Sequence, residues 1–185
     1  MDFLKLTVDR LSVEEISDLV RNEECGAVSV FMGTTRNFFH DKKVVSLEYE
    51  AYETMAIKAL KSICTNIREK WSQVQHIAIY HRLGTVPASE ASVIIAISGT
   101  HRREPIDAVS YCIDQLKATV PIWKKEKYEN DVAVWKENKE CAWASNNMEH
   151  FICDISRVWY ARDIDELATC HDWPIKLAKC ESAYL

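Results

Sequence analysis

Glycine is scarce in this chain, with four residues in 185, at positions 26, 33, 84 and 99. A phosphate-binding P-loop and a dinucleotide-binding fingerprint each need several glycines at fixed spacing, so the chain carries neither. It also lacks the Gly-x-Ser-x-Gly turn that presents a nucleophilic serine. These absences exclude the commonest signatures of nucleotide binding and of serine hydrolysis.

Long apolar runs are absent too. No stretch approaches the roughly 20 residues needed to span a bilayer, and Met1–Arg10 carries charges throughout, unlike a secretory signal peptide. The formal net charge is −5, which disfavours general binding to nucleic acid or anionic membranes, because both need a basic surface. With 48% apolar and 28% charged residues, the chain has the composition of a globular protein with a core.

The seven cysteines form no Cys-x-x-Cys pair. Cys25, Cys64 and Cys112 fall inside apolar strand or helix patterns, where free cysteine behaves as a small hydrophobic residue. The ligand-type residues near the C-terminus do not have zinc-site spacing; they are His150, Cys153, Cys170, His171 and Cys180. The sequence therefore predicts no metal site, and it favours a reducing cytosol as the compartment.

Apolar periodicity predicts an α+β domain of mixed sheet and packed helices over residues 1–147. The first expected helix begins with a capping box at Ser12 and Glu15, and two more span 53–71 and 105–119. Pro121 stops the last of these. Strands are expected at 3–8, 25–32, 45–52, 74–83 and 91–98, and short strand or loop at 122–135. Residues 148–185 are expected to form a short helical extension.

Several elements have a predicted face. In strand 25–32, Val28, Val30 and Met32 share one face, and strand 91–98 is expected to be buried on both faces. Three further sets are expected to point inward: Val13, Ile16, Leu19 and Val20; Val45, Leu47, Tyr49 and Ala51; and Ile106, Val109, Ile113 and Leu116.

Cationic side chains are concentrated in Ser98–Lys127, which holds six Lys/Arg and one His. Cations gathered locally in an acidic protein indicate an anion site. His101 and Arg102 follow a buried strand and precede a helix, where free backbone amides favour an anion. The alternative interpretation is that both side chains only cover a helix start in solvent.

Lys117 and Lys124 lie seven residues apart, on either side of Pro121. Neighbouring ammonium groups lower a lysine pKa and make a base or nucleophile, whereas the helix C-terminus favours the cation on Lys117. The alternative is a solvated basic patch.

Arg36 and Glu126 are two further candidates. The loop at Gly33–Arg36 is expected to let Arg36 reach a ligand, and Glu126 is expected to orient a lysine. The alternative for both is an ordinary surface position, where an ion pair contributes little.

Six segments occur in the same order in one protein family. They are GTTRN (Gly33–Asn37), LEYEAY (Leu47–Tyr52), IYHRLG (Ile79–Gly84), the His101-Arg102 pair, LKATVPIWKKE (Leu116–Glu126) and WKENKECAWAS (Trp135–Ser145). Together they resemble the large, catalytic subunit of molybdopterin synthase in its eukaryotic form, over about residues 1–147. The resemblance implies an α/β hammerhead fold, a central homodimer, a small ubiquitin-like subunit at each outer end of a heterotetramer, and no metal or dissociable cofactor.

In that family, the C-terminal Gly-Gly thiocarboxylate of the small subunit enters a pocket of the large subunit. Its sulfur is transferred to cyclic pyranopterin monophosphate, which forms the dithiolene of molybdopterin. The resemblance implies that Lys117, Lys124 and Arg36 are catalytic. It implies substrate binding by Thr34, Thr35, Arg36, His101, Arg102, Lys117, Lys124, Lys125 and Glu126.

The chain departs from the family pattern at two places. Arg103-Glu104-Pro105 follows the His-Arg pair where small or apolar residues are usual, and this change either alters the pocket rim or caps the helix differently. Met148–Leu185 has no counterpart in the family. Two alternative hypotheses follow: a non-catalytic scaffold that uses the tail for assembly, and a different enzyme acting on a phosphorylated small molecule.

Overall fold

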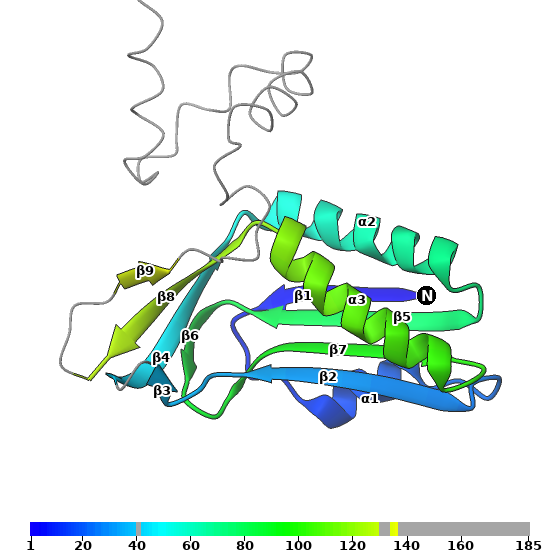
Figure 1. Cartoon of the computed structure of the whole chain (residues 1–185), viewed down its shortest axis with the longest axis horizontal. Coiled ribbons are helices and arrows are strands. Elements are labelled where there is room, and N and C mark those ends of the chain that lie inside the picture. Colours follow the sequence, from blue (N-terminus) through cyan, green and yellow to red (C-terminus); the bar gives the residue numbers. More distant parts are fainter. Residues whose placement is uncertain (40–41, 130–133, 137–185) are drawn as a thin grey trace, which may run out of the picture. The chain divides into compact units, whose positions relative to one another are not determined.

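The computed structural model describes residues 1–39, 42–129 and 134–136. Within these ranges the chain is an α+β fold of three helices and nine strands (Figure 1). In order, the elements are β1 (Asp2–Thr7), α1 (Val13–Val20), β2 (Ala27–Thr34), β3 (Phe38–Phe39), β4 (Lys42–Ala51), α2 (Glu53–Lys70), β5 (Val74–Arg82), β6 (Gly84–Pro87), β7 (Ala91–Gly99), α3 (Arg103–Thr119), β8 (Ile122–Tyr128) and β9 (Val134–Lys136). The expected extension at 148–185 and the domain boundary at 147 lie outside the described residues.

The first sheet has the strand order β1-β5-β7-β2, with β1 parallel to β5 and the other pairs antiparallel. Helices α2 and α3 cover one face of this sheet, and α1 covers part of the other (Figure 1). Strand β7 lies between two strands and two helix layers, so all of its residues from Ser92 to Gly99 are buried. This arrangement confirms the predicted mixed sheet with packed helices.

The second sheet has the order β3-β4-β8-β9, and β6 also pairs with β4. Strand β6 was not expected, because four residues carry too little alternation to indicate a strand. Its pairing with β4 comes from the tertiary structure. A turn follows it: the Glu90 amide donates to the Pro87 carbonyl over 3.2 Å, and Ser89 has a φ of 71°.

Some predicted inner residues are exposed instead. Ile106 is 55% exposed because the buried stripe of α3 runs through Pro105 and Ala108, about one residue away from the expected face. Val45 is exposed because a bulge between Val44 and Ser46 turns those two residues inward. Val13 and Leu19 of α1 are also exposed, since a helix of two turns buries only Ile16 and Val20.

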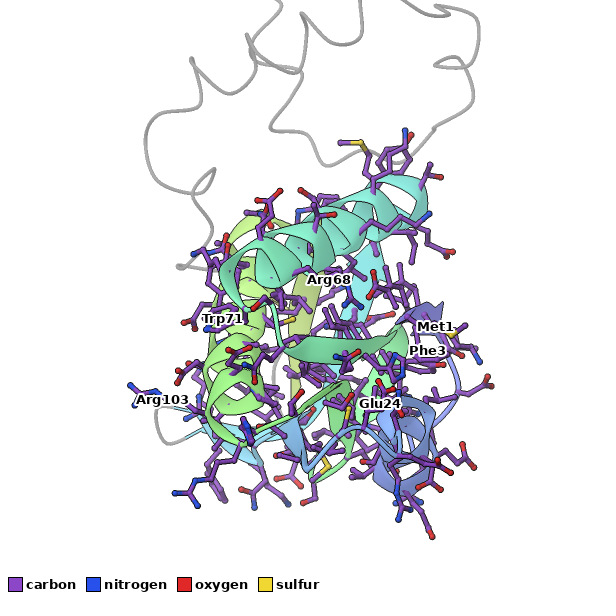
Figure 2. The ribbon with its side chains drawn as sticks, turned by 90° about the vertical axis from the view of Figure 1, so that its right-hand side faces the viewer. Met1, Phe3, Glu24, Arg68, Trp71 and Arg103 are labelled. Carbon is purple, nitrogen blue, oxygen red and sulfur yellow. The ribbon has the colours of Figure 1, made fainter. Side chains whose placement is uncertain are left out.

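Arg68 in the last turn of α2 and Trp71 just after it fix the position of this helix. The Arg68 guanidinium donates to Asp2 Oδ1 over 2.5 Å and to the carbonyls of Met1 and Val74 over 3.2 Å, which ties α2 to the starts of β1 and β5 (Figure 2). Trp71 contacts Tyr111 of α3 edge to face, with ring centroids 5.5 Å apart. No helix among the described residues is long and apolar enough to cross a membrane.

Helix α3 ends where Pro121 was predicted to stop it. The Val120 amide still donates to the Leu116 carbonyl over 3.1 Å, but proline has no amide to continue the pattern. The Ile122 amide instead donates to the Val120 carbonyl over 2.8 Å, which makes a tight turn into β8. This turn places Lys117 at the end of α3 and Lys124 near the start of β8.

Candidate active site

Four of the predicted site residues lie on or next to the turn between α3 and β8. Lys117 is in the last turn of α3, and Lys124, Lys125 and Glu126 follow on β8. Because side chains alternate along a strand, Lys124 and Glu126 share one face of the sheet and Lys125 lies on the other. Their register partners on β4 agree with this: Tyr49 opposes Lys124, and Glu48 opposes Lys125. The structure therefore does not bring Lys125 to the face that carries Lys124.

The loop after β2 lies at the same end of the domain. The Ser92 hydroxyl donates to the Gly33 carbonyl over 3.2 Å, and Ser92 also forms a hydrogen bond with Tyr49. Tyr49 is in turn the register partner of Lys124 on β8. The side chains of Ser92 and Tyr49 therefore link the segment Thr34–Arg36 to β8. Thr34 and Arg36 are exposed, whereas Thr35 is buried at 2% exposure.

Thr35 holds this loop in place. Its amide donates to the Glu90 carbonyl over 3.1 Å, and its carbonyl accepts from the Ser89 amide over 2.8 Å. Glu90 in turn pairs with Arg82, with 2.5 Å between Arg82 Nη1 and Glu90 Oε2. Within the described ranges, the buried Thr35 Oγ1 and Arg82 Nε have no hydrogen-bond partner. Arg36 thus projects from a loop that is anchored on both sides.

A buried polar cluster lies on the inner face of β8. Glu126 is 5% exposed, and its carboxylate accepts a hydrogen bond from the Tyr128 hydroxyl. Burial raises the pKa of Tyr49; the hydrogen bond with Ser92 opposes this rise, and the charge of Glu126 adds to it. Sequence reasoning did not single out Tyr49, Tyr128 or Ser92 as functional. The one sequence feature that could have pointed to them is a polar side chain at a strand position that faces inward.

His81 completes this cluster from β5. Its ring meets the Tyr49 ring edge to face, with centroids 4.9 Å apart. The ring Nδ1 lies 2.8 Å from the Arg82 carbonyl oxygen, so it carries the proton and donates. Burial lowers the pKa of His81 to about 4, against a smaller opposing effect of that hydrogen bond. His81 is therefore neutral at pH 7.

His101 and Arg102 lie at the opposite end of α3 from Lys117. Fifteen residues separate Arg102 from Lys117, about 22 Å at the α-helical rise of about 1.5 Å per residue. Both side chains are exposed, and Arg102 forms the N-cap of α3 without a side-chain capping bond. The Gly26 amide donates to the Thr100 carbonyl over 3.3 Å, which places the pair beside the start of β2. One copy of the chain does not bring the pair to the lysines.

The unusual Arg103-Glu104-Pro105 segment forms the first turn of α3. Pro105 is buried, and a Glu104 carboxylate oxygen accepts from the Gln73 amide over 2.9 Å. The Arg103 side chain is 90% exposed and projects from the molecule at the start of the helix (Figure 2). The segment therefore packs the start of α3 against the sheet through Pro105 and ties it to the turn before β5 through Glu104.

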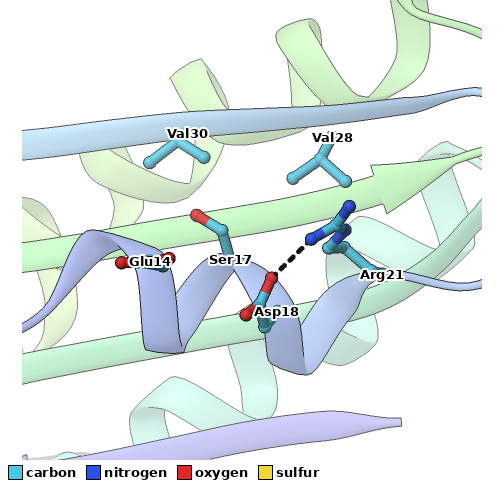
Figure 3. A pocket seen from close by; sticks show the side chains of 6 residues that line it. All are labelled: Glu14, Ser17, Asp18, Arg21, Val28 and Val30. Atoms are coloured by element: carbon cyan, nitrogen blue, oxygen red, sulfur yellow. Dashed lines mark hydrogen bonds and ion pairs between the residues drawn. The ribbon is translucent and has the colours of Figure 1, made fainter.

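An open hollow of about 330 Å³ lies between α1 and β2 (Figure 3). On the helix side it is lined by Glu14, Ser17 and an ion pair between Arg21 and Asp18, 2.8 Å apart. Val28 and Val30 line the strand side, and none of the predicted site residues does. Both valines are 39% exposed and Met32 is 49% exposed, so the predicted apolar face of β2 is largely uncovered in one copy.

Two buried thiols are not suited to nucleophilic attack. Cys64 and Cys112 are buried and free. Burial raises the pKa of Cys64 to about 12 and also raises the pKa of Cys112, and a thiol must lose its proton to attack. Among the described residues no group of three His, Cys, Asp or Glu side chains is placed to hold a metal ion.

Comparisons with known proteins agree on one family. Residues 6–119 match the family described as MoaE protein. A molybdopterin synthase catalytic subunit of Taeniopygia guttata is 60% identical over 145 residues, covering 78% of this chain and 93% of that protein. The crystal structure of molybdopterin synthase from Staphylococcus aureus is 38% identical with a TM-score of 0.68, covering 71% of this chain and 95% of that one. A third match is a chain in the complex of subunits 1 and 2 of the Helicobacter pylori molybdopterin-converting factor. It is 19% identical with a TM-score of 0.65, covering 78% of this chain and 97% of that one. This match shows a similar fold.

Proposed function

The chain belongs to the MoaE family, the catalytic subunits of molybdopterin synthase, and we propose that it transfers sulfur from a thiocarboxylated small subunit to cyclic pyranopterin monophosphate. Membership makes it a sulfurtransferase subunit of molybdenum cofactor biosynthesis. The proposal concerns the substrate, the sulfur donor and the residues that act on them.

One observation carries the residue assignment: Lys117, Lys124 and the Arg36 loop lie at one end of the domain. The substrate is an anion, so cationic side chains there offset its charge. Lysine ammonium groups also transfer protons while the sulfur of the thiocarboxylate attacks carbon. We assign Lys117 and Lys124 to proton transfer, and Arg36 to binding the substrate anion. The inert Cys64 and Cys112 fit a reaction in which sulfur arrives on a partner.

The partner is proposed to be a small ubiquitin-like subunit whose Gly-Gly tail ends beside Lys117. The Helicobacter pylori protein of the same fold was solved as a complex of two subunits, which supports such an assembly. Lys117 lies in the last turn of α3, and the Pro121 carbonyl four residues later accepts from the amide of exposed Tyr52 over 3.3 Å. We place the reaction in the cytosol, where free thiols such as Cys25 stay reduced.

A second copy of this chain is proposed to complete the site. Strand β2 is the last strand of the first sheet, and its Val28, Val30 and Met32 are exposed. An antiparallel pairing of β2 with the β2 of a second copy joins the start of one strand to the end of the other. His101 and Arg102 lie beside the start of β2, and Thr34–Arg36 follow its end. The dimer thus supplies the His-Arg pair that one chain keeps far from Lys117.

Reconstitution with Lys117→Ala tests the function and the assignment together. The purified protein is mixed with thiocarboxylated small subunit and cyclic pyranopterin monophosphate, and molybdopterin is measured. We expect the wild type to form product and Lys117→Ala to form at least about 100-fold less, because a proton-transfer group is lost. Lys61→Ala, an exposed lysine of α2, is the matched control and should keep full activity.

Binding of the small subunit is measured on the same samples. Lys117→Ala should bind it as the wild type does, since the lysine acts in chemistry. Full activity of Lys117→Ala would remove this lysine from the mechanism. A stable complex in which the wild type makes no product would favour the non-catalytic scaffold.

A further inference from the structure

Two tyrosines lie against the Lys124–Glu126 face of β8, and the proposed chemistry does not use them. Tyr128 is buried, and its hydroxyl donates to the Glu126 carboxylate. Tyr49 is partly buried on β4 and is the register partner of Lys124. Neither tyrosine belongs to the set of residues predicted to touch substrate.

Strand geometry fixes how these four side chains meet. Directly opposed residues of an antiparallel pair have Cβ atoms about 5 Å apart, so Tyr49 and Lys124 are side-chain neighbours. Lys124 and Glu126 are two positions apart on one strand, about 7 Å, and point to the same side. Glu126 therefore lies between Lys124 and Tyr128 along β8.

The rest of the cluster keeps both tyrosines in place. The Tyr49 ring is held edge to face by His81, 4.9 Å between centroids, and Tyr49 forms a hydrogen bond with Ser92. The ammonium of Lys42 lies 5.6 Å from the centre of the Tyr128 ring. Both rings are thus fixed by contacts from other strands, which is the condition for a side chain that must orient another.

We propose that Tyr128 and Tyr49 are positioning residues of the sulfur-transfer site: Tyr128 holds the Glu126 carboxylate in one orientation, and Tyr49 confines the side chain of Lys124. This inference rests on the proposed function of the chain. Neither tyrosine touches the reacting atoms. Each acts through its neighbour, by restricting where the carboxylate and the ammonium lie when the substrate is bound.

The charges around Lys124 determine how this positioning shows in experiment. Tyr49 of β4 is its register partner as a neutral phenol, and Glu126 and Tyr128 share its strand. Neutral His81 of β5 contacts the Tyr49 ring. Glu126 is the carboxylate of this set, and the Tyr128 hydroxyl donates to it.

Two substitutions should therefore change the surroundings of the Lys124 side chain. Tyr128→Phe removes the hydroxyl that donates to Glu126, and Tyr49→Ala removes the ring beside Lys124. Each should shift the side-chain NMR signal of Lys124, which is identified by its loss in Lys124→Arg.

Kinetics of the reconstituted complex give the second readout. Tyr128→Phe should lower kcat about tenfold with KM within about twofold. Tyr49→Phe keeps the ring and should retain most activity, whereas Tyr49→Ala should lower kcat about tenfold. Tyr80→Phe, at a partly buried tyrosine of β5 that packs on the α1 side of the first sheet, is the matched control and should behave as the wild type.

The two readouts separate this inference from the proposed function. If the wild type makes no molybdopterin, the proposed function fails, while the NMR signal of Lys124 still tests the positioning. The inference is overturned if folded Tyr128→Phe keeps the wild-type kcat and the wild-type Lys124 signal. If Tyr128→Phe does not fold, Tyr49→Ala decides, and an unchanged kcat with an unchanged Lys124 signal also overturns it.

Discussion

At the scale of single residues, the charge state of His81 places the strongest constraint on the polar core. It is 4% exposed and lies between the Arg82 carbonyl and the Tyr49 ring. A proton on this ring would bring an unpaired charge into the cluster that holds Glu126 and Lys124. Burial keeps the ring neutral, so the cluster around Lys124 keeps its charge arrangement at physiological pH.

This burial predicts a loss of stability in acid. The pKa of His81 is about 4 in the folded state and about 6.5 in the unfolded chain, so between these values the unfolded state binds more protons. The free energy of unfolding is therefore not reduced by His81 protonation above about pH 6.5, and it falls by about 3 kcal/mol as the pH drops toward 4. Urea unfolding of the wild type and of His81→Gln between pH 4 and pH 8 measures this pH dependence. His81→Gln should be less stable at pH 7 and show a shallower pH dependence; equal slopes would contradict the prediction.

At the scale of elements, the junction between β7 and α3 is packed too closely for a side chain at Gly99. A Cβ there would lie 2.8 Å from Pro105 Cγ and 3.0 Å from the Gln73 carbonyl oxygen. Pro105 is part of α3 and is itself buried, so it has little room to move. The absence of a side chain at position 99 thus lets α3 start directly against the sheet, with His101 and Arg102 displayed beside β2.

Gly99→Ala should therefore destabilise the fold by about 1–3 kcal/mol, the usual cost of overpacking. Chemical denaturation of both proteins measures the difference. Thr100→Ala is the control, since the exposed neighbouring side chain should change stability by less than about 0.5 kcal/mol. A Gly99→Ala protein as stable as the wild type would show that α3 shifts at no cost.

At the scale of the whole molecule, the separation of cationic groups along α3 has a functional consequence. Lys117 and Arg102 belong to the same helix but to its two ends. A single copy therefore offers an incomplete set of anion-binding groups at either end. The proposed pairing through β2 gives two equal sites, each with the lysines of one copy and the His-Arg pair of the other.

Mixed dimers test this arrangement. A hybrid of Lys117→Ala and Arg102→Ala copies, co-expressed and purified by two different tags, has one intact site of two and should show about half the wild-type activity. The two parent proteins should each be at least about tenfold impaired. A hybrid of Lys117→Ala and Lys124→Ala is the control and should stay inactive, because each site then carries a defect. An inactive first hybrid would place Arg102 and Lys117 in the same copy's site.

The sequence by itself determined the elements with strong periodicity and the family to which the chain belongs. The apolar run of β7, the helix predicted over 53–71 and the stop at Pro121 were correct because burial and proline act locally along the chain. The family segments around Arg36, Lys117 and Lys124 carried the function, which the MoaE relationship confirms at the level of the catalytic subunit.

Only the tertiary structure decided which side chains meet. The bulge at Val44 that exposes Val45, and the pairing of β6 with β4, arise from contacts between strands and leave no local pattern. The alternation of β8 separates Lys125 from Lys124, and the length of α3 separates His101 from Lys117. The enclosure of Glu126 by Tyr128 and of Tyr49 by His81 joins residues from three strands. Such contacts depend on how distant segments pack, so sequence spacing alone does not contain them.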